Sequence, residues 1–529
     1  MSDSGTLNRL GDQVFSRSAG AHLVHGNAVR LLRDAAQNYP AWLAAIRSAR
    51  RSVHFENYIV HEDDVGERFA VAFLDKARDG VPVRVIYDWF GSLGNASAAF
   101  WRRLREGGVE VRCYNRPRLD QPLGWIGRDH RKCLVVDGGV AFVTGLCVGA
   151  MWEGAPAPGP PGWRDTGVEV RGPAVAEVAR AFADSWAATG APLPPDAVAA
   201  ESAAAGDLDV RVVASTLGTA GLYRLDTVVA SLARRTLWLT DAYFAGTSTY
   251  VQALRAASED AVDVRLLVPG PGSDVPVMRA VSRAGYRALL EAGIRVFEWN
   301  GSMLHAKTAV ADARWARVGS TNLNLASWMG NRELDVVVEN AGFGREMEAM
   351  FLDDLGKSTE IVLHRWARVR PAENVPRPRL PGAGGSATRA AAGALRVGNA
   401  LGSVLAARRV HGPAERWLMA QGGLLLAVLA TGGFLWPRLL AWPLAGFGLW
   451  LGLALLVRAA QRWATSPPTR PRATGSPPPG QQPRVPGAPE AHPARAASTA
   501  RQALPREPPH LSEHRSRPGA DPPRAADRR

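Results

Sequence analysis

The chain has 529 residues, a formal net charge of +14 and three cysteines that form no C-x-x-C pair. The length suffices for two or three domains with a large buried core. The cysteine content argues against a disulfide framework or a cysteine-based zinc site and indicates reduced thiols. The positive charge suits an anionic membrane surface or another polyanion as the partner, but it does not distinguish lipid from nucleic acid. The N-terminus, residues 1–10, is polar and lacks the apolar core of a signal peptide, so no cleaved export signal is expected.

A pattern of strand, helix and strand occurs twice along the chain. Residues 51–88 contain the strands RSVHFENYIV and GVPVRVIYD around an amphipathic helix, and residues 235–269 repeat the order with RTLWLTDAYF and AVDVRLLVP. A further strand follows each unit, at 107–115 and 292–300. Strands that alternate with helices predict an α/β fold with mostly parallel sheets covered by helices on both faces. We therefore expect two similar α/β half-domains, at residues 1–200 and 201–370.

The composition changes after residue 370. Residues 371–416 predict a Pro/Gly-rich linker and a candidate amphipathic helix, and 417–457 contain two uncharged apolar runs, each close to the length that a bilayer core requires. We expect a transmembrane helical hairpin there, with a buried or interfacial helical pair as the alternative. Arginines on both sides of this segment place its two ends in the cytoplasm by the positive-inside rule. Residues 464–529 are rich in Pro and Arg without hydrophobic periodicity, and we expect them to be disordered.

One motif, H-x-K-x4-D, occurs once in each predicted half, at residues 130–137 and 305–312. Because alternate residues of a strand share a face, the histidine and the lysine of each copy project together. The whole chain has four lysines, and two of them stand in these motifs, so coincidence explains the pattern poorly. The motif residues are His130, Lys132, Asp137, His305, Lys307 and Asp312.

These residue types suit the chemistry of phosphodiesters. One imidazole can attack phosphorus and form a phosphohistidine, and a second can protonate the leaving alkoxide and later deprotonate the incoming alcohol. Lysines can stabilise charge on the non-bridging oxygens, and a carboxylate can fix the orientation of a histidine. Since each half supplies one such histidine, both halves must meet at one site. We expect neither a metal nor a cofactor, because the chain has no HExxH motif or Asp/Glu cluster.

Residues from about 26 to 365 resemble the phospholipase D superfamily, whose signature is this duplicated motif. The runs SVHFENYIV, VPVRVIYDWFGS, HAKTAVAD and GSTNLNLAS are similar to bacterial cardiolipin synthases, in particular to the B type. The resemblance implies two phospholipase-D-like halves related by a pseudo-twofold axis around one active site. One of the motif histidines would be the nucleophile and the other the acid and base. The motif lysines would bind phosphate, and the motif aspartates would support the fold and the orientation of the histidines.

The resemblance also implies residues that bind the substrate beside the motifs. Gly319, Ser320 and Asn322 match the family's GSxN element, whose polar groups lie beside the phosphate, and Glu333 matches an acidic partner of a histidine, with Asp165 as its first-half counterpart. Cys147 stands where the family usually has Asn, and a thiol is a poorer donor than an amide. Either the first half does not need the amide, or its phosphate site is weakened.

The leading hypothesis is a cardiolipin synthase that transfers a phosphatidyl group from one phosphatidylglycerol to another through a phosphohistidine and releases glycerol. It predicts an enzyme of the bacterial inner membrane whose catalytic domain faces the cytoplasm, with anionic phospholipid and the membrane surface as partners. Nucleic acid is not expected. The alternatives are a phospholipase D hydrolase, another transphosphatidylase, or a nuclease of the same superfamily, which the positive charge permits but the apolar segment disfavours.

Overall fold

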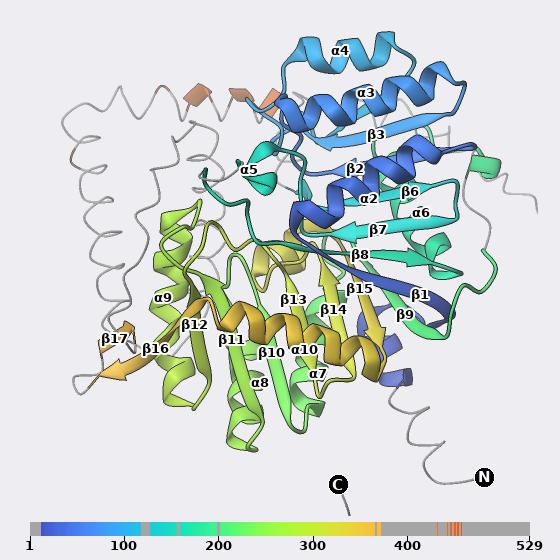
Figure 1. Ribbon diagram of the computed structural model, residues 1–529. Coiled ribbons are helices and arrows are strands. Elements are labelled where there is room, and N and C mark those ends of the chain that lie inside the picture. The colour runs from blue at the N-terminus through green and yellow to red at the C-terminus, as the bar shows by residue number, and fades with distance from the viewer. Residues whose placement is uncertain are drawn as a thin grey trace, which may run out of the picture. The chain divides into compact units, whose positions relative to one another are not determined.

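The computed structural model describes residues 12–117, 127–155, 159–197, 202–364 and 368–371, with scattered positions between 431 and 456. The two predicted halves belong to one unit of the chain (Figure 1). The expected linker at 371–416, the apolar hairpin at 417–457 and the tail at 464–529 lie wholly or almost wholly outside the described residues. Within the described part, no helix has both the length and the apolar character needed to cross a membrane.

Each half is built on one mixed sheet. The first sheet has the strand order β4-β3-β2-β6-β7-β8-β1. Its strands are β1 (Val24–Arg33), β2 (Val53–Asn57), β3 (Val83–Asp88), β4 (Glu110–Tyr114), β6 (Cys133–Val136), β7 (Val140–Thr144) and β8 (Thr166–Arg171).

The second sheet repeats this order as β12-β11-β10-β13-β14-β15-β9 and is extended beyond β12 by β16 and β17. Its strands are β9 (Leu208–Ser215), β10 (Thr236–Thr240), β11 (Asp263–Pro269), β12 (Arg295–Trp299), β13 (Thr308–Ala311), β14 (Trp315–Gly319), β15 (Asn331–Glu339), β16 (Ser358–His364) and β17 (Arg368–Pro371).

The prediction of α/β halves is confirmed, but the prediction of mostly parallel sheets is wrong. Only the strands of the predicted strand–helix–strand units, β2 to β4 and β10 to β12, pair in parallel in each sheet. The motif strands β6 and β13 instead form hairpins with β7 and β14 and pair antiparallel on both sides. The turns of these hairpins are short, and a short turn joins only antiparallel strands.

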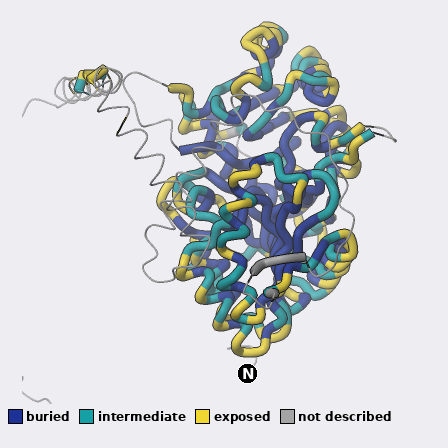
Figure 2. The backbone as a smooth tube through the Cα atoms, turned by 90° about the vertical axis from the view of Figure 1, so that its left-hand side faces the viewer, coloured by how far each residue is buried: buried dark blue, intermediate teal, exposed yellow. Residues whose placement is uncertain are grey.

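Helices cover both faces of each sheet, as the strand pattern predicts. One face of the first sheet packs against α2 (Asp34–Ser48), α3 (Asp64–Arg78) and α4 (Ala98–Glu106), and one face of the second against α7 (Gly221–Leu232), α8 (Ser248–Glu259) and α9 (Pro276–Glu291). The opposite faces pack against α6 (Ala174–Ala188) and α10 (Ala341–Leu355). Side chains alternate between the two faces along each strand. Leu134 and Val136 of β6 pack on the side of α2, α3 and α4, and Cys133 and Val135 pack on the side of α6. The strands form the buried interior (Figure 2).

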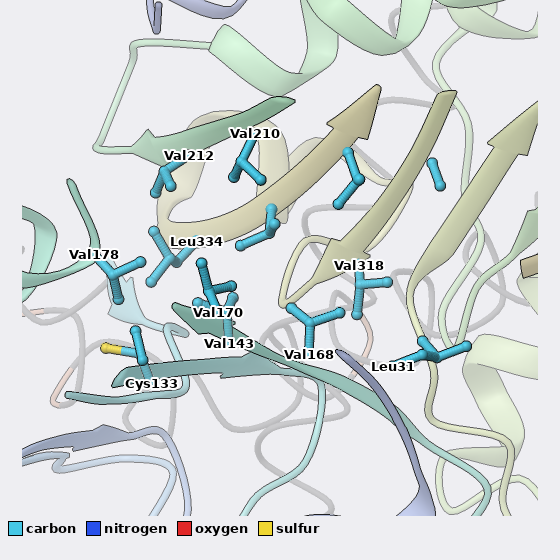
Figure 3. Packing of buried hydrophobic residues seen from close by; sticks show 14 of the residues in the cluster. Leu31, Cys133, Val143, Val168, Val170, Val178, Val210, Val212, Val318 and Leu334 are labelled. Carbon is cyan, nitrogen blue, oxygen red and sulfur yellow. The ribbon is translucent and has the colours of Figure 1, made fainter. Parts of the chain in front are cut away.

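The two halves share one hydrophobic core. Val143 and Val168 of the first sheet belong to the same buried cluster as Val318 and Leu334 of the second (Figure 3). Strand β1 also pairs with β8 through its C-terminal part and with β9 through its N-terminal part, which links the two sheets by backbone hydrogen bonds. The relative position of the two motifs is therefore fixed by packing and by the backbone together.

Candidate active site

The two motif histidines are held by backbone contacts that cross between the halves. The amide of His130, which follows the short strand β5 (Arg128–Asp129), donates to the carbonyl of Arg332 at 2.9 Å. The amide of His305 donates in the same way to the carbonyl of Arg164 at 2.7 Å. Each motif is thus anchored to the other half at a residue that directly precedes an acidic residue, Glu333 on β15 or Asp165 just before β8.

Those acidic residues contact the imidazoles, again across the halves. Nδ1 of His130 lies 2.9 Å from Oε2 of Glu333, and Nδ1 of His305 lies 2.7 Å from Oδ2 of Asp165. Both histidines are 5 % exposed, and both carboxylates are fully buried. Because a carboxylate engages Nδ1 in each case, we expect Nε2 to be the ring nitrogen that reacts.

Both imidazoles line one cavity of about 60 Å³. The first half contributes most of the remaining wall, including Tyr58, Phe90 and Trp152, and the second half contributes Tyr243, Asp274 and Val275. A single cavity that joins the two histidines is the arrangement that a two-step transfer through one phosphorus atom requires.

The motif lysines lie behind the histidines. Nζ of Lys132 donates to the carbonyl of His130 at 2.6 Å, and Nζ of Lys307 donates to the carbonyl of His305. Each ammonium also faces a tyrosine ring, with 5.0 Å from Lys132 to the ring centre of Tyr58 and 5.8 Å from Lys307 to that of Tyr243. Two buried positive charges at one cavity form a strong attraction for an anion.

The protonation of the site differs between the two pairs. Burial, helped by the charge of Lys307, lowers the pKa of His305 to about 3, against the opposing effect of Asp165. Burial alone would raise the pKa of Asp165, but His305 and Lys307 bring it below its ordinary value. Burial raises the pKa of Glu333 to about 7, although Lys132 and hydrogen bonds oppose it. At neutral pH the second-half histidine is therefore an uncharged imidazole beside an ionised carboxylate.

Burial also lowers the pKa of both motif lysines. The pKa of Lys132 falls below its ordinary value, and that of Lys307 falls to about 8. The two charges repel each other, which adds to the effect on Lys307, while Asp165 opposes it. An anionic phosphate in the cavity would favour the charged form of both lysines.

The motif aspartates do not touch the histidines, which corrects one part of the sequence-based expectation. Asp137 accepts hydrogen bonds from the backbone amides of residues 50–52, and Asp312 accepts them from the amides of residues 234–236. Both aspartates have a positive φ, at 54° and 53°, in the turns that follow β6 and β13. They support the fold, and the orientation of the imidazoles belongs to Asp165 and Glu333.

The GSxN element lies beside Glu333. The hydroxyl of Ser320 donates to Oε2 of Glu333 at 2.6 Å and accepts from the amide of Leu334 at 2.9 Å. Gly319 leaves no room for a side chain, because a Cβ there would come within 2.5 Å of the backbone of Asp335. The amide of Asn322 lies 3.5 Å from the hydroxyl of Ser327.

The first half lacks this serine. The amide of Gly145 donates to the carbonyl of Thr166 as that of Ser320 donates to Leu334, so Gly145 is the counterpart of Ser320. A Cβ at Gly145 would lie 2.2 Å from Oδ1 of Asp165, which explains why glycine stands there. Cys147 is buried, and the charges of Lys132 and Lys307 act on its thiol, whose pKa burial raises.

Comparison with known proteins identifies the family. A family model described as "Cardiolipin synthase, PLD-like domain" matches residues 42–147 and 229–355, which contain both motifs. Cardiolipin synthase A of Pseudomonas fluorescens is 33 % identical over 350 residues, covering 63 % of this chain and 70 % of the relative. Cardiolipin synthase A of Pseudomonas aeruginosa is 35 % identical over 345 residues, covering 63 % and 68 %. The chain belongs to the cardiolipin synthase family.

Among solved structures, the phosphatidylserine synthase of Haemophilus influenzae shares the fold of this cardiolipin synthase family member. The TM-score is 0.52 at 14 % sequence identity, with 66 % of this chain and 91 % of that chain covered. Both relatives named above are of type A, whereas the sequence was expected to resemble type B.

Several residues of the cavity were missed from the sequence. Tyr58 directly follows β2 and Tyr243 stands three residues after β10, and each ring faces the motif lysine of its own half. That shared tyrosine was a signal that the repeat already contained. Trp152 lies on the short helix α5 (Ala150–Glu153), and Asp274 lies in the loop between β11 and α9. The equivalent loop of the first half, between β3 and α4, contributes Phe90 to the cavity and no carboxylate, so the repeat did not indicate Asp274.

Proposed function

We propose that the protein is a cardiolipin synthase, which moves a phosphatidyl group from one phosphatidylglycerol to a hydroxyl of a second and releases glycerol. One observation supports this most: two imidazoles from opposite halves, each tied at Nδ1 to a carboxylate, line one cavity. The membership in the cardiolipin synthase family supplies the substrate class.

The chemistry follows from the positions of these groups. Nε2 of one histidine attacks phosphorus, and the P–O bond to the departing glycerol breaks while the second histidine gives that oxygen a proton. The second histidine then removes a proton from the incoming hydroxyl, whose oxygen attacks the phosphohistidine and regenerates the first imidazole. Lys132 and Lys307 stabilise the charge on the non-bridging oxygens. Asp165 and Glu333 hold the rings and stabilise whichever imidazole becomes charged.

The cavity is too small for more than the reacting head of a lipid. Its volume of about 60 Å³ is far below that of a phospholipid with two acyl chains, so we infer that the acyl chains stay outside. We infer that the catalytic unit works at the surface of the bacterial inner membrane, on its cytoplasmic side. The arginines that flank residues 417–457 support this orientation.

The test is lipid analysis of a bacterial host that lacks its own cardiolipin synthases. Cells that express the full chain should gain cardiolipin, and His130→Ala and His305→Ala should each abolish the gain. Radiolabelled phosphatidyl donor should also leave an acid-labile phosphoryl adduct on the wild-type protein. Phosphatidic acid as the sole product would select the hydrolase instead, and nicking of plasmid DNA without lipid turnover would select the nuclease.

A further inference from the structure

We propose that Asp274, positioned by Tyr243, is the site that binds the glycerol headgroup, with its carboxylate accepting hydrogen bonds from the glycerol hydroxyls. This inference rests on the proposed function and specifies the part of the cavity that chooses the alcohol. Both residues line the same cavity as the two motif histidines.

The tyrosine connects the phosphate end of the cavity to the carboxylate. Its ring packs edge-on to His305, with 5.9 Å between ring centres, and faces the ammonium of Lys307 at 5.8 Å. Its hydroxyl donates to both carboxylate oxygens of Asp274, each at 2.9 Å. The carboxylate therefore meets the hydroxyl end of the ring, while the ring itself packs against His305 and faces Lys307.

The loop that presents Asp274 is fixed by its neighbours. It lies between the end of β11 and the start of α9, and Val275 packs in a small buried cluster with Tyr243, Met278 and Met303. The hydroxyl of Ser273 also donates to the carbonyl of Val275 at 3.3 Å. A carboxylate on such a support can impose a preferred geometry on a ligand.

The charge of the site indicates which part of the substrate the carboxylate faces. A carboxylate repels the phosphate, so it serves an uncharged or cationic portion of the headgroup. A cationic headgroup would be repelled by Lys132 and Lys307, whose ammonium groups face the cavity-lining rings of Tyr58 and Tyr243, whereas a neutral polyol would meet no such repulsion. Among the lining residues that the structure describes, Asp274 alone has a carboxyl group; His61 and Asn95 are also polar, and Phe90 and Trp152 are among the largely apolar rest.

One such site serves both steps of the reaction. The headgroup of phosphatidylglycerol carries two neighbouring free hydroxyls, and after the first step it leaves as glycerol. The site is then empty for the second lipid, whose reacting hydroxyl also has a hydroxyl on the adjacent carbon. A carboxylate that accepts from that neighbouring hydroxyl would orient the departing and the arriving alcohol alike.

An alcohol-competition assay tests this assignment. Membranes containing the full-length protein receive a phosphatidylglycerol donor together with deuterated glycerol, 1-propanol or ethanolamine, and mass spectrometry measures the three exchange products. 1-Propanol has the carbon chain of glycerol without the two additional hydroxyls. We expect Asp274→Asn to lower the glycerol-to-propanol ratio by about tenfold or more, and to raise KM for phosphatidylglycerol more than it lowers kcat. Tyr243→Phe should act in the same direction by a smaller factor.

Asp260→Asn, at an exposed carboxylate after α8, provides the matched control and should leave the ratio unchanged. An unchanged ratio in Asp274→Asn, or an equal loss for glycerol and 1-propanol, would overturn the assignment. A selective loss of ethanolamine transfer would also overturn it, because the carboxylate would then serve an ammonium group. If the wild type exchanges alcohols but forms no cardiolipin, the proposed function fails while the ratio still decides the role of Asp274.

Discussion

The contact between Asp165 and His305 gives a prediction that separates the charge of a carboxylate from its shape. Oδ1 of Asp165 accepts from the backbone amide of Thr166 at 2.8 Å, and Oδ2 accepts from the indole of Trp152 at 3.2 Å while it contacts His305 at 2.7 Å. In Asp165→Asn the fixed backbone donor keeps the amide oxygen at the Oδ1 position. The NH₂ group then occupies the Oδ2 position and donates to Nδ1 of His305, while the indole of Trp152 loses its longer hydrogen bond at 3.2 Å.

This reversal puts the histidine proton on Nε2, the nitrogen that must stay free to attack or to accept a proton. The same substitution in the serine-protease triad, where the tautomer is also reversed, lowers kcat by about 10⁴, which corresponds to about 5.5 kcal/mol in the activation free energy. We expect Asp165→Asn to lower kcat for cardiolipin formation by about 10³ to 10⁴, with a smaller change in KM.

The assay is steady-state cardiolipin formation in membranes with equal amounts of folded enzyme, which limited proteolysis can check. Asp184→Asn, an exposed carboxylate on α6, is the matched control and should retain full activity. The reasoning would be refuted if Asp165→Asn kept more than a tenth of the wild-type kcat. The imidazole would then not depend on the charged acceptor at Nδ1.

Three further predictions concern the remaining groups of the site. Burial in the folded state raises the pKa of Glu333 from 4.5 to about 7, so the stabilisation by its protonated form is complete below pH 4.5 and is lost as the pH rises through 7. Relative to Glu333→Gln, the wild type should lose about 3 kcal/mol of unfolding free energy over this window, which denaturant titrations at pH 5 and pH 8 can measure. Asp312→Ala removes the acceptor of three backbone amides and places alanine at a φ of 53°, so the unfolding free energy should fall by about 1–3 kcal/mol, and an unchanged denaturation midpoint would contradict this role. Asn322→Ala should lower kcat/KM by about tenfold or more and Cys147→Ala by less than about threefold, because an amide is a stronger hydrogen-bond donor than a thiol. Equal losses in the two variants would show instead that both halves bind the phosphate alike.

The sequence predicted the parts of the site that follow from duplication. The repeated motif indicated two histidines at one site, and the structure places His130 and His305 at one cavity. The pairing of Glu333 and Asp165 with histidines was inferred from family resemblance. That each carboxylate serves the histidine of the other half depends on how the two sheets pack, which no local pattern along the chain reveals.

The remaining differences also arise from contacts distant in sequence. Strand and helix periodicity located the elements but did not distinguish parallel from antiparallel pairing for β6 and β13, because both kinds of buried strand are apolar throughout. Asp274 lies in a loop whose first-half counterpart, between β3 and α4, brings no carboxylate to the cavity, and its place there depends on the contact with Tyr243 and on the packing of Val275. The segments after residue 371 stay predictions, since almost all of them lie outside the described residues.

The exchange of carboxylates between the halves constrains how such a protein can have arisen. A single ancestral half would have held its own histidine but not the acid that orients it, so it would have worked only as a symmetric pair of identical chains. In such a pair every substitution changes the surroundings of both histidines at once. Joining two copies in one chain allows the two halves to differ. Gly145 and Ser320 stand at equivalent positions and show such a difference: glycine makes room for Asp165, whereas the hydroxyl of Ser320 donates to Glu333.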